Sequence, residues 1–543
     1  MIQIAQLKLS LDADESEVRK ATRKVLAIED AQIRSFSVRQ RAIDARGGDV
    51  CFSYTVWVET DDEERLLDRR HRKVQVTRAP DRGYRILEQL PTASPDRSRP
   101  IVVGTGPCGL FAALLLARKG MRPIVFERGK QAGPRARDVT GFWRRGHEFN
   151  PESNVQFGEG GAGTFSDGKL YTQIKDRDNR IPWILQEMVK AGAPEDILVK
   201  SRPHIGTDRL ITVVRHLREE ILELGGDLHY ETRIDDVRLE NGRIAGVMTD
   251  AGNWFESDIV VLAVGHSARD TFEMLHRKGV PMEAKSFSMG VRIEHPQRLI
   301  DQIQFGSKAG HEALGASPYK FAWHDRDGRG VYSFCMCPGG LVVAASSEEG
   351  GVVTNGMSSY ARAEANANSG FMVEIRPQDI QGEGPLAGVA FQRFWEKKAF
   401  EAGGGDYKAP AQRLGDFLKG QASREAGSVN PSYEPGVVWT DIRECVPALV
   451  AKALRASVRG IDRRLRGFLL EDAVLTGVES RSSSPLRIPR DPTSLECVSI
   501  KGLFPAGEGA GYAGGIISAA ADGLKVAEAI LASAGQKETD GSK

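Results

Sequence analysis

The chain has 543 residues, with 74 Lys and Arg against 73 Asp and Glu, for a net charge of +1. At roughly 150 residues per domain, this length predicts three or four domains. A nearly neutral chain has no overall field to attract polyanions, so nucleic-acid binding is not favoured. Six cysteines are too few for a disulfide scaffold and favour a reducing cytoplasm. No signal-peptide core and no apolar run of ~20 residues is present in the sequence, so we expect a cytoplasmic protein outside the membrane.

The first 90 residues predict a small α+β domain. Residues 15–26 have the apolar spacing of a helix, and CFSYTVWVET at 51–60 alternates like a strand. Acidic and basic residues are nearly equal in number here, so the basic clusters are interpreted as solvated surface. The Pro- and Ser-rich stretch at 91–98 is typical of a linker.

A glycine-rich turn follows the apolar run IVV at 101–103 and precedes an apolar helix expected over 107–119. Gly104 suits the tight turn, Gly106 leaves room for a pyrophosphate, and Gly109 lets the helix pack close to the strand. Glu127 ends the next strand, where a carboxylate accepts hydrogen bonds from ribose hydroxyls. This arrangement predicts a dinucleotide site without choosing between FAD and NAD. The predicted contacts are Gly104, Gly106, Pro107, Cys108, Gly109, Glu127 and Arg128.

The same glycine pattern recurs near the C-terminus at Gly509, Gly511 and Gly514. A strand over 503–506 leads into it and a helix from about 515 follows, but no acid-ended strand comes after. We interpret it as the last strand and helix of the same domain. FAD continues beyond its pyrophosphate into ribitol and a large ring, so a second contact segment points to FAD. The predicted contacts are Gly507, Glu508, Gly514, Gly515 and Ile516, and Tyr512 is a candidate for substrate contact, with packing as the alternative.

These motifs resemble a known family. The chain is similar to uncharacterised FAD-dependent dehydrogenases, of the NAD(FAD)-utilising dehydrogenase type, in GTGPCGLFAALLLARKG, NVQFGEGGAGTFSDGKLYT, SMGVRIEHPQRLID, YSFCMCPGGLVV and LFPAGEGAGYAGGIISAAADG. The apolar run that ends in Ala506-Gly507-Glu508 resembles, more distantly, fumarate reductase and aspartate oxidase flavoproteins. The resemblance covers most of residues 95–530. It implies FAD binding and redox chemistry, but no particular substrate.

A third glycine-rich segment, at 158–163, lacks a β-branched strand before it and a helix after it. It is therefore not a second nucleotide-binding turn, and its glycine density suits backbone lying flat against a ligand. In the flavoproteins that the chain resembles, such a segment crosses the flavin ring or the pyrophosphate; a loop without ligand contact is the alternative. The predicted contacts are Gly160, Gly161, Gly163 and Thr164. Lys169 is a candidate to stabilise the reduced flavin by its charge, or else a surface lysine.

Two strand segments supply further candidates. The segment TRIDDV is expected to present the backbone of Ile234 to adenine, and in similar flavoproteins the strand end at Gly265 passes the cofactor. His266 is a candidate acid or base, with a loop-capping role as the alternative. Cys335 and Cys337 share a strand face by their spacing, and lack the C-x-x-C of a disulfide reductase. We interpret them as buried structural cysteines.

Three arginines near small hydroxyl residues, Arg481, Arg487 and Arg490, suit a carboxylate or phosphate substrate, with a surface loop as the default interpretation. The sequence contains no H-E-x-x-H, paired C-x-x-C or EF-hand pattern, so no metal is predicted.

The sequence as a whole predicts an α/β protein. We expect a discontinuous Rossmann-type FAD-binding domain over 99–270 and 497–535, an inserted α/β substrate or cap domain over 271–496, and a disordered tail over 536–543. The expected function is FAD-dependent oxidoreductase acting on a small molecule, with NAD(P)H as a candidate transient donor. The alternative is a structural FAD, with an N-terminal domain that binds nucleic acid or a protein partner.

Overall fold

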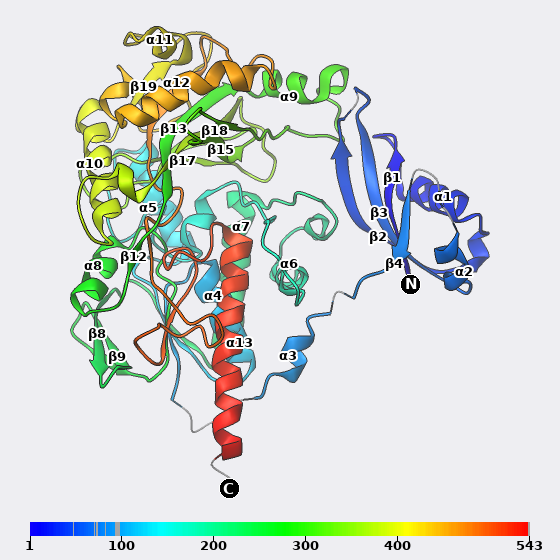
Figure 1. The fold of residues 1–543 in the computed structure, drawn as a ribbon, viewed down its shortest axis with the longest axis horizontal. Helices are drawn as coiled ribbons and strands as arrows, with labels where there is room; N and C mark the ends of the chain where they lie inside the picture. Colours follow the sequence, from blue (N-terminus) through cyan, green and yellow to red (C-terminus); the bar gives the residue numbers. More distant parts are fainter. Residues whose placement is uncertain (47, 70, 72–73, 82, 93–97, 541–543) are drawn as a thin grey trace.

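The computed structural model describes residues 1–46, 48–69, 71, 74–81, 83–92 and 98–540. A small N-terminal unit stands to one side of a larger body that contains two main sheets (Figure 1). Most of the expected linker, 93–97, lies outside the described residues. In the described part of the chain, no helix is both long and apolar enough to cross a membrane.

The N-terminal unit is a four-stranded sheet in the order β2-β3-β1-β4, with helices α1 and α2. Strand β3 alternates buried and half-buried residues, so one sheet face forms the core of this unit. A backbone hydrogen bond of 2.8 Å from Arg41 N to Val199 O joins the unit to the body. The bounds are β1 Ile2–Leu9, α1 Glu15–Leu26, β2 Ile33–Asp44, β3 Cys51–Thr60, α2 Glu63–Asp68 and β4 Gln75–Arg78.

The segment around helix α3 (Arg85–Gln89) packs on the body, although the sequence placed it in the N-terminal domain. Tyr84 donates a hydrogen bond to the carboxylate of Glu528, and its ring centre lies 5.4 Å from that of Trp183. Desolvation and the Glu528 carboxylate both raise the pKa of the Tyr84 hydroxyl above its usual value. Residues from Tyr84 onward therefore contribute to the core of the body.

The first main sheet has five parallel strands in the order β23-β11-β5-β6-β7. Val260 in β11 pairs with Ile101 in β5 on one side and with Leu503 in β23 on the other. Segments more than 200 residues apart along the chain thus form one sheet, as the two glycine turns suggested. The bounds are β5 Ile101–Val103, β6 Ile124–Phe126, β7 Asp227–His229, β11 Val260–Leu262 and β23 Leu503–Pro505.

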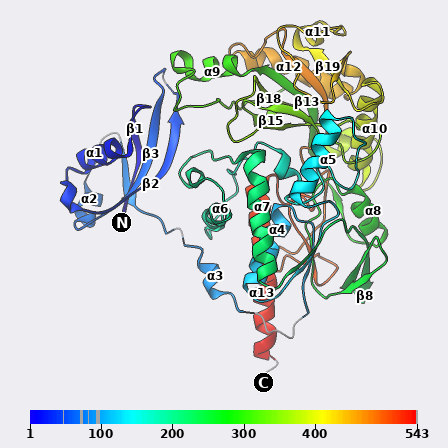
Figure 2. The same cartoon turned by 180° about the vertical axis from the view of Figure 1, so that it is seen from behind.

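Helices cover one face of this sheet and a smaller sheet covers the other. Because side chains alternate along a strand, Val102 and Val261 pack on the helical layer, whereas Ile101 and Val260 face the opposite layer. The helical layer contains α4 Pro107–Arg118, α6 Arg180–Lys190, α7 Gly206–Glu223 and α13 Ile516–Asp540 (Figure 2). The opposite layer contains β8 Ile234–Glu240, β9 Arg243–Thr249, β10 Trp254–Glu256 and α8 Arg269–Arg277.

The second main sheet comes from the inserted region and has seven strands, in the order β14-β15-β18-β13-β21-β19-β20. Its long central pair, β13 and β18, is buried along nearly its whole length, since helices and loops cover both faces. The strand bounds are β13 Phe287–Pro296, β14 Ala322–His324, β15 Gly330–Cys337, β18 Asn366–Ile375, β19 Ala409–Arg413, β20 Val437–Trp439 and β21 Val474–Glu479.

Helices and two short strand pairs surround this sheet. The helices are α5 Ala132–Arg144, α9 Gln297–Phe305, α10 Ala387–Ala402, α11 Leu414–Lys419 and α12 Ala448–Asp462. The short pairs are β12 Glu283–Ala284 with β22 Leu486–Arg487, and β16 Leu341–Ala344 with β17 Thr354–Met357.

The C-terminal helix is longer than the sequence indicated. Helix α13 continues to Asp540, whereas a disordered tail was expected from residue 536. Residues 541–543 lie outside the described part of the chain. The long helix crosses the body beside α4, as Figures 1 and 2 show.

We expect the close approach of α13 to α4 to depend on Gly523. A Cβ at this position would lie 2.1 Å from the carbonyl oxygen of Cys108, which is backbone and cannot move aside. Gly523→Ala should lower the stability by about 1–3 kcal/mol through overpacking, and lower the Tm measured by calorimetry. Gly133→Ala is the matched control, because its Cβ would meet no described atom within 4 Å. An unchanged Tm for Gly523→Ala would contradict this account of the contact.

Candidate functional site

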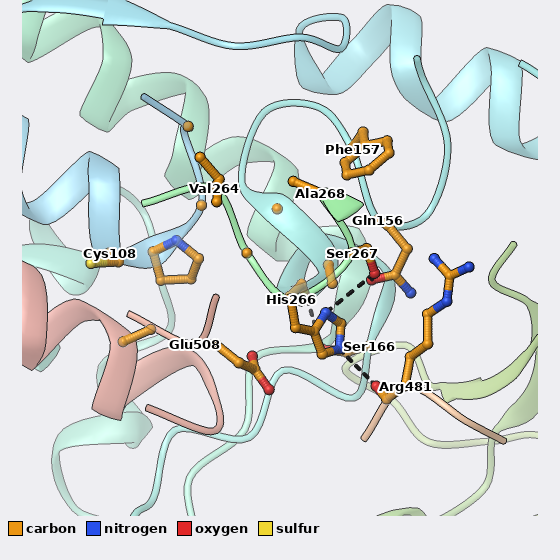
Figure 3. A pocket seen from close by; sticks show the side chains of 18 of the residues that line it. Cys108, Gln156, Phe157, Ser166, Val264, His266, Ser267, Ala268, Arg481 and Glu508 are labelled. Carbon is orange, nitrogen blue, oxygen red and sulfur yellow. Dashed lines mark hydrogen bonds between the residues drawn. The ribbon is translucent and has the colours of Figure 1, made fainter. Parts of the chain in front are cut away.

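One pocket lies where the carboxyl ends of the five parallel strands meet the seven-stranded sheet (Figure 3). Open α/β sheets bind ligands at this edge of their strands. The space between atoms amounts to about 1560 Å³, part of it open to solvent. Residues of both sheets line this space, from the glycine turn after β5 to strands β15, β17 and β21.

The glycine turn between β5 and α4 forms one end of the pocket. Gly104 has a φ of +102°, and a Cβ there would lie 2.4 Å from the carbonyl oxygen of Ala263. Gly106 caps helix α4, and with Pro107 and Cys108 it lines the pocket. Gly109 does not, so this geometry gives no support to its predicted cofactor contact. Its missing side chain lets the helix lie on the Gly104 carbonyl, which is the packing role that was also predicted for it.

Glu127 follows β6 and is almost fully buried. Its Oε2 accepts hydrogen bonds from the Thr105 amide (2.9 Å) and hydroxyl (2.7 Å). Its Oε1 accepts from the amides of Gly129 and Gly158, each at 3.0 Å. Four donors of the chain thus bind to the carboxylate, which links the two glycine-rich segments. Glu127 also lines the pocket. The predicted contact with a ribose remains a prediction.

The glycine-rich segment at 158–163 is held in place by Arg135 of helix α5. This guanidinium is fully buried and donates to the carbonyl oxygens of Asn154, Val155, Gly158, Glu159 and Gly161 at 2.7–3.1 Å. Burial lowers its pKa to about 10, while Glu127 and Glu159 oppose that shift, so the group stays charged at neutral pH. The segment is irregular because a side chain, rather than a strand or helix, satisfies its carbonyls.

This segment contributes only part of the predicted contacts. Gly161 and Gly163 line the pocket. Gly160 and Thr164 lie outside its lining: the Gly160 amide donates to Thr105 O at 2.9 Å, and the Thr164 hydroxyl donates to Glu159 O at 3.2 Å. Both residues shape the turn, and the prediction that they contact the ligand directly is not met by this geometry.

The strand ends of β6, β8 and β11 supply the next part of the wall. Arg128, Ile234 and Gly265 line the pocket, and their predicted contacts with the cofactor stay predictions. Arg128 forms ion pairs with Glu152 and Asp270 at 2.8 and 2.9 Å, and its guanidinium lies 4.0 Å from the ring centre of Phe157. The charge of Arg128 is therefore largely compensated within the chain.

The C-terminal glycine turn brings Glu508, Gly514, Gly515 and Ile516 to the pocket. Among the described atoms, none lies within 4 Å of a Cβ built at Gly265, Gly514 or Gly515. These open positions, together with the helix N-terminus after Gly106, form a wall of exposed backbone. Such a wall fits a dinucleotide, because its phosphates and ring need backbone N–H groups at close approach.

Two predicted residues of this turn face elsewhere. Gly507 has a φ of +71°, and a Cβ there would lie 2.9 Å from that of Cys108, so it serves packing. The Tyr512 hydroxyl donates to Ile488 O at 3.2 Å and accepts from the Arg490 amide at 3.1 Å. Tyr512 is thus a packing residue, and its candidate role at a substrate is wrong for this structure.

The three predicted arginines separate. Arg490 lies 3.7 Å from the Tyr512 ring centre and pairs with Asp522 at 2.6 Å, and Arg487 is exposed. Only Arg481 lines the pocket. Arg481 shares the buried carboxylate of Glu396 with Arg269, at 2.8 Å in each pair.

His266 and Glu508 lie close together beside Ser267 and Arg481 (Figure 3). The Nε2 of His266 donates to the Arg481 carbonyl oxygen at 2.7 Å, and its Nδ1 lies 3.2 Å from the Ser267 hydroxyl. Burial raises the pKa of Glu508, while His266 and Lys285 oppose that shift. The histidine is held by backbone, as its loop-capping interpretation implied, and Glu508 has a carboxylate that faces the pocket.

Lys169 carries surplus positive charge at the pocket wall. Its Nζ lies 2.8 Å from Asp167 Oδ2, but Asp167 also accepts two hydrogen bonds from Arg362, at 2.8 and 2.6 Å. Burial lowers the pKa of Lys169, but Asp167, Cys337 and Cys335 together outweigh this, and the pKa lies above its usual value. One carboxylate thus faces two cations, and Lys169 stays protonated.

The inserted sheet forms the far wall, through residues of β15, β17 and β21. The two cysteines there differ: Cys337 is buried, but Cys335 is exposed to the pocket. A bulge in β15 and a φ of +40° at Cys335 break the alternation that the C-x-C spacing assumed. Desolvation raises the pKa of the Cys335 thiol to about 12, so it is not a thiolate at neutral pH.

Sequence reasoning did not find several residues of the wall. They include Gln156, Phe157, Ser267, Ala268, Asn355 and Glu479. Gln156 and Phe157 directly precede the third glycine-rich segment. Their position beside that segment is the signal in the sequence that could have identified them. Glu479 ends a mostly apolar strand of the inserted sheet. The contact of that sheet with the pocket is visible only in the folded structure.

Comparison with known proteins agrees with this geometry. Residues 286–482 match the model of an FAD-dependent protein C-terminal domain, and residues 102–158 match that of an NAD(P)-binding Rossmann-like domain. A Clostridium beijerinckii protein named only as uncharacterized is 46% identical over 98% of both chains. This chain belongs to the FAD-dependent oxidoreductase family. FAD is its cofactor, and the fold is mixed α/β with a Rossmann-type FAD-binding domain, as the sequence predicted.

Other matches to this flavoprotein are partial. FixC of Salmonella typhi is 30% identical over 40% of this chain and 48% of its own length. The Bacillus halodurans glycerol-3-phosphate dehydrogenase structure, complexed with FAD, is 12% identical over 84% of this chain and 67% of its own, with a TM-score of 0.35. Residues 1–59 match a domain of unknown function.

We expect Arg135→Lys to disrupt the pocket, because an ammonium has three donors for five carbonyls. Loss of stability should reach about 3 kcal/mol or more, since buried acceptors are left unpaired. The purified protein should retain little FAD, measured by absorbance against protein content. Arg137→Lys, at an exposed position on the same helix, should keep the FAD of the parent protein. Full FAD content in Arg135→Lys would contradict the role of Arg135.

Proposed function

We propose that this flavoprotein transfers electrons between its FAD and a small molecule held against the inserted sheet. One observation supports this most directly: a single pocket extends from the glycine turn after β5 to the wall formed by β15, β17 and β21. The cofactor would occupy the first part and leave its reactive ring facing the second. FAD supplies the two-electron chemistry, and the chain supplies binding, orientation and charge.

The proposed FAD contacts follow the order of the pocket wall. The N-terminus of α4 would receive the pyrophosphate, because its first N–H groups are free to donate there. The strand ends near Glu127, Arg128 and Ile234 would hold the adenosine, and Gly265 would lie alongside the cofactor. The flavin and ribitol would lie against Gly161, Gly163, Glu508, Gly514, Gly515 and Ile516.

The substrate side would use the remaining wall, which combines the apolar Phe334 with polar Asn355 and Ser482. The Rossmann-like match at 102–158 coincides with the unit assigned to FAD. Reduction by NADH or NADPH would therefore use transient docking at the ring. The other donor in the catalytic cycle that we propose is an organic substrate.

The test is anaerobic reduction of the purified yellow holoprotein. NADH, NADPH and a panel of small hydroxy acids and amino acids are mixed with it one at a time, and the flavin absorbance is followed. At least one donor should bleach the flavin within seconds to minutes. A protein that cannot be loaded with FAD would overturn the proposal.

Failure of every donor to bleach the flavin would instead favour the structural-FAD alternative. Its own test is retention of RNA by the full chain at low salt and release at high salt, because phosphate contacts weaken as salt rises.

We expect Lys169→Met to make the flavin harder to reduce, because a buried positive charge near the pocket favours the more negative reduced state. Its midpoint potential should fall by roughly 20–40 mV, equivalent to about 1–2 kcal/mol for a two-electron couple. Potentiometric titration measures this. Lys175→Met, at an exposed position, is the control. An unchanged potential in Lys169→Met would place the charge away from the flavin.

A further inference from the structure

Glu479 is an acid of the inserted sheet that reaches the pocket. It is the last residue of β21, its side chain is 4% exposed, and it lines the wall that we assign to the substrate. Gly370 of β18, which lies on the far side of β13 from β21, leaves space for it: a Cβ at Gly370 would lie 3.0 Å from Glu479 Oε1. The carboxyl group is thus enclosed by protein on one side and open to the pocket on the other.

The only ion pair that Glu479 makes with a described residue joins its Oε2 to Arg292 Nε at 2.6 Å. Arg292 divides its other donors between the Cys335 carbonyl oxygen, at 2.9 Å, and Asn355 Oδ1, at 2.8 Å. Within the described residues, neither Glu479 Oε2 nor Arg292 Nε has a hydrogen-bond partner, so their contact is an ion pair without an aligned hydrogen bond. One cation that is shared with other acceptors stabilises a buried carboxylate only weakly.

Three other buried acids near the pocket are saturated by comparison, whereas Glu508 lies on the side of the pocket that we assign to the cofactor. Glu127 accepts four hydrogen bonds from the chain. Asp167 is held by Arg362, Lys169 and the Ser358 hydroxyl, and Glu396 by two arginines. These acids are used to hold the structure, whereas no hydrogen bond from a described residue reaches Glu479 Oε1, which is the oxygen left for proton exchange.

The surroundings of Glu479 set the pKa of its carboxyl group close to neutral pH. Burial raises the pKa of Glu479 to about 7, and Arg292 opposes that shift. Cys335, Cys337 and Tyr319 also face Arg292, and burial raises the pKa of each of them. They stay neutral at pH 7, so Glu479 is the group of this cluster that changes charge there.

We propose that Glu479 is the residue that exchanges a proton with the substrate, and that the substrate is an alcohol or an amine. This rests on the proposed function. As the substrate's C–H bond breaks, its hydride carries two electrons to FAD. The O–H or N–H proton on the same carbon's substituent passes to the Glu479 carboxylate, and a C=O or C=N bond forms. Glu479 then releases the proton to solvent.

Other candidates are less suited to this role. Lys169 stays protonated beside Asp167, so it has no free pair to accept a proton. The Nε2 of His266 is committed to a backbone carbonyl oxygen. The Cys335 thiol is a poor base at neutral pH because its thiolate is disfavoured.

The first test measures the proton on Glu479 directly and needs no substrate. Infrared spectra of the holoprotein are recorded from about pH 5 to about pH 9, in the region of the protonated carboxyl stretch. A band that disappears with a midpoint near pH 7 is expected in the parent and in the exposed-site control Glu312→Gln, and should be missing in Glu479→Gln. No such band assignable to Glu479 would overturn the proposal, whatever donor reduces the flavin.

The second test uses the alcohol or amine donor that bleaches the flavin fastest in the panel above. The single-turnover rate of the parent should rise with pH around 7, as the carboxylate forms. Glu479→Gln should be slower by at least about 100-fold, with that pH dependence lost, because a general base contributes 10²–10⁴-fold. Reduction by NADH releases no O–H or N–H proton. Its rate in Glu479→Gln should therefore differ from that of the parent by less than about threefold.

Several results separate the two ideas. A Glu479→Gln rate within about threefold of the parent overturns the role of Glu479 but leaves the oxidoreductase function intact. Reduction by NADH alone, with no alcohol or amine active, overturns the substrate class. If Glu479→Gln loses its FAD, Glu479→Asp replaces it: a retained but displaced pH midpoint supports the proposal, and an unchanged profile contradicts it.

Discussion

The pairing of β11 with β5 on one side and β23 on the other is the contact on which the rest of the structure depends. It brings the end of the chain to the glycine turn near residue 104 and closes the inserted region between them. Apolar residues of β11 are buried on both faces of the sheet, so the pairing is stabilised by two separate cores. The two glycine turns at the pocket are positioned by the pairing of this one strand.

A second layer of organisation comes from buried charges that satisfy backbone. Arg135 holds five carbonyls of the irregular segment at 154–161, and Glu127 holds amides on either side of it. A loop rich in glycine would otherwise lose much conformational entropy on ordering. The hydrogen bonds of Arg135 and Glu127 offset this loss of entropy. They give the pocket a wall of backbone that no helix or strand supplies. The same residues then have no spare capacity for chemistry.

The inserted sheet contributes the opposite kind of residue. Its buried polar groups near the pocket are less completely paired, and Glu479 and Asn368 both keep atoms without a partner among the described residues. Unpaired buried polar atoms cost stability, so the position of Glu479 on the wall facing the substrate is consistent with use in binding or proton exchange. The rigid, saturated half of the pocket would hold the cofactor, and the less saturated half would act on the substrate.

The amino-acid sequence by itself determined the α/β class, the two glycine turns, their cofactor, and the strand before and the helix after each turn, because these signals are local: glycine spacing, apolar runs and an acid at a strand end. Gly109 was assigned its packing role in advance for this reason. Only the tertiary structure decided which side chains reach the pocket. It turned Tyr512, Gly160 and Thr164 away, exposed Cys335 through a bulge, and brought Glu479 in from a sheet far along the chain. Such choices depend on long-range packing and on which partner satisfies each buried polar group, and neither is encoded in spacing along the chain.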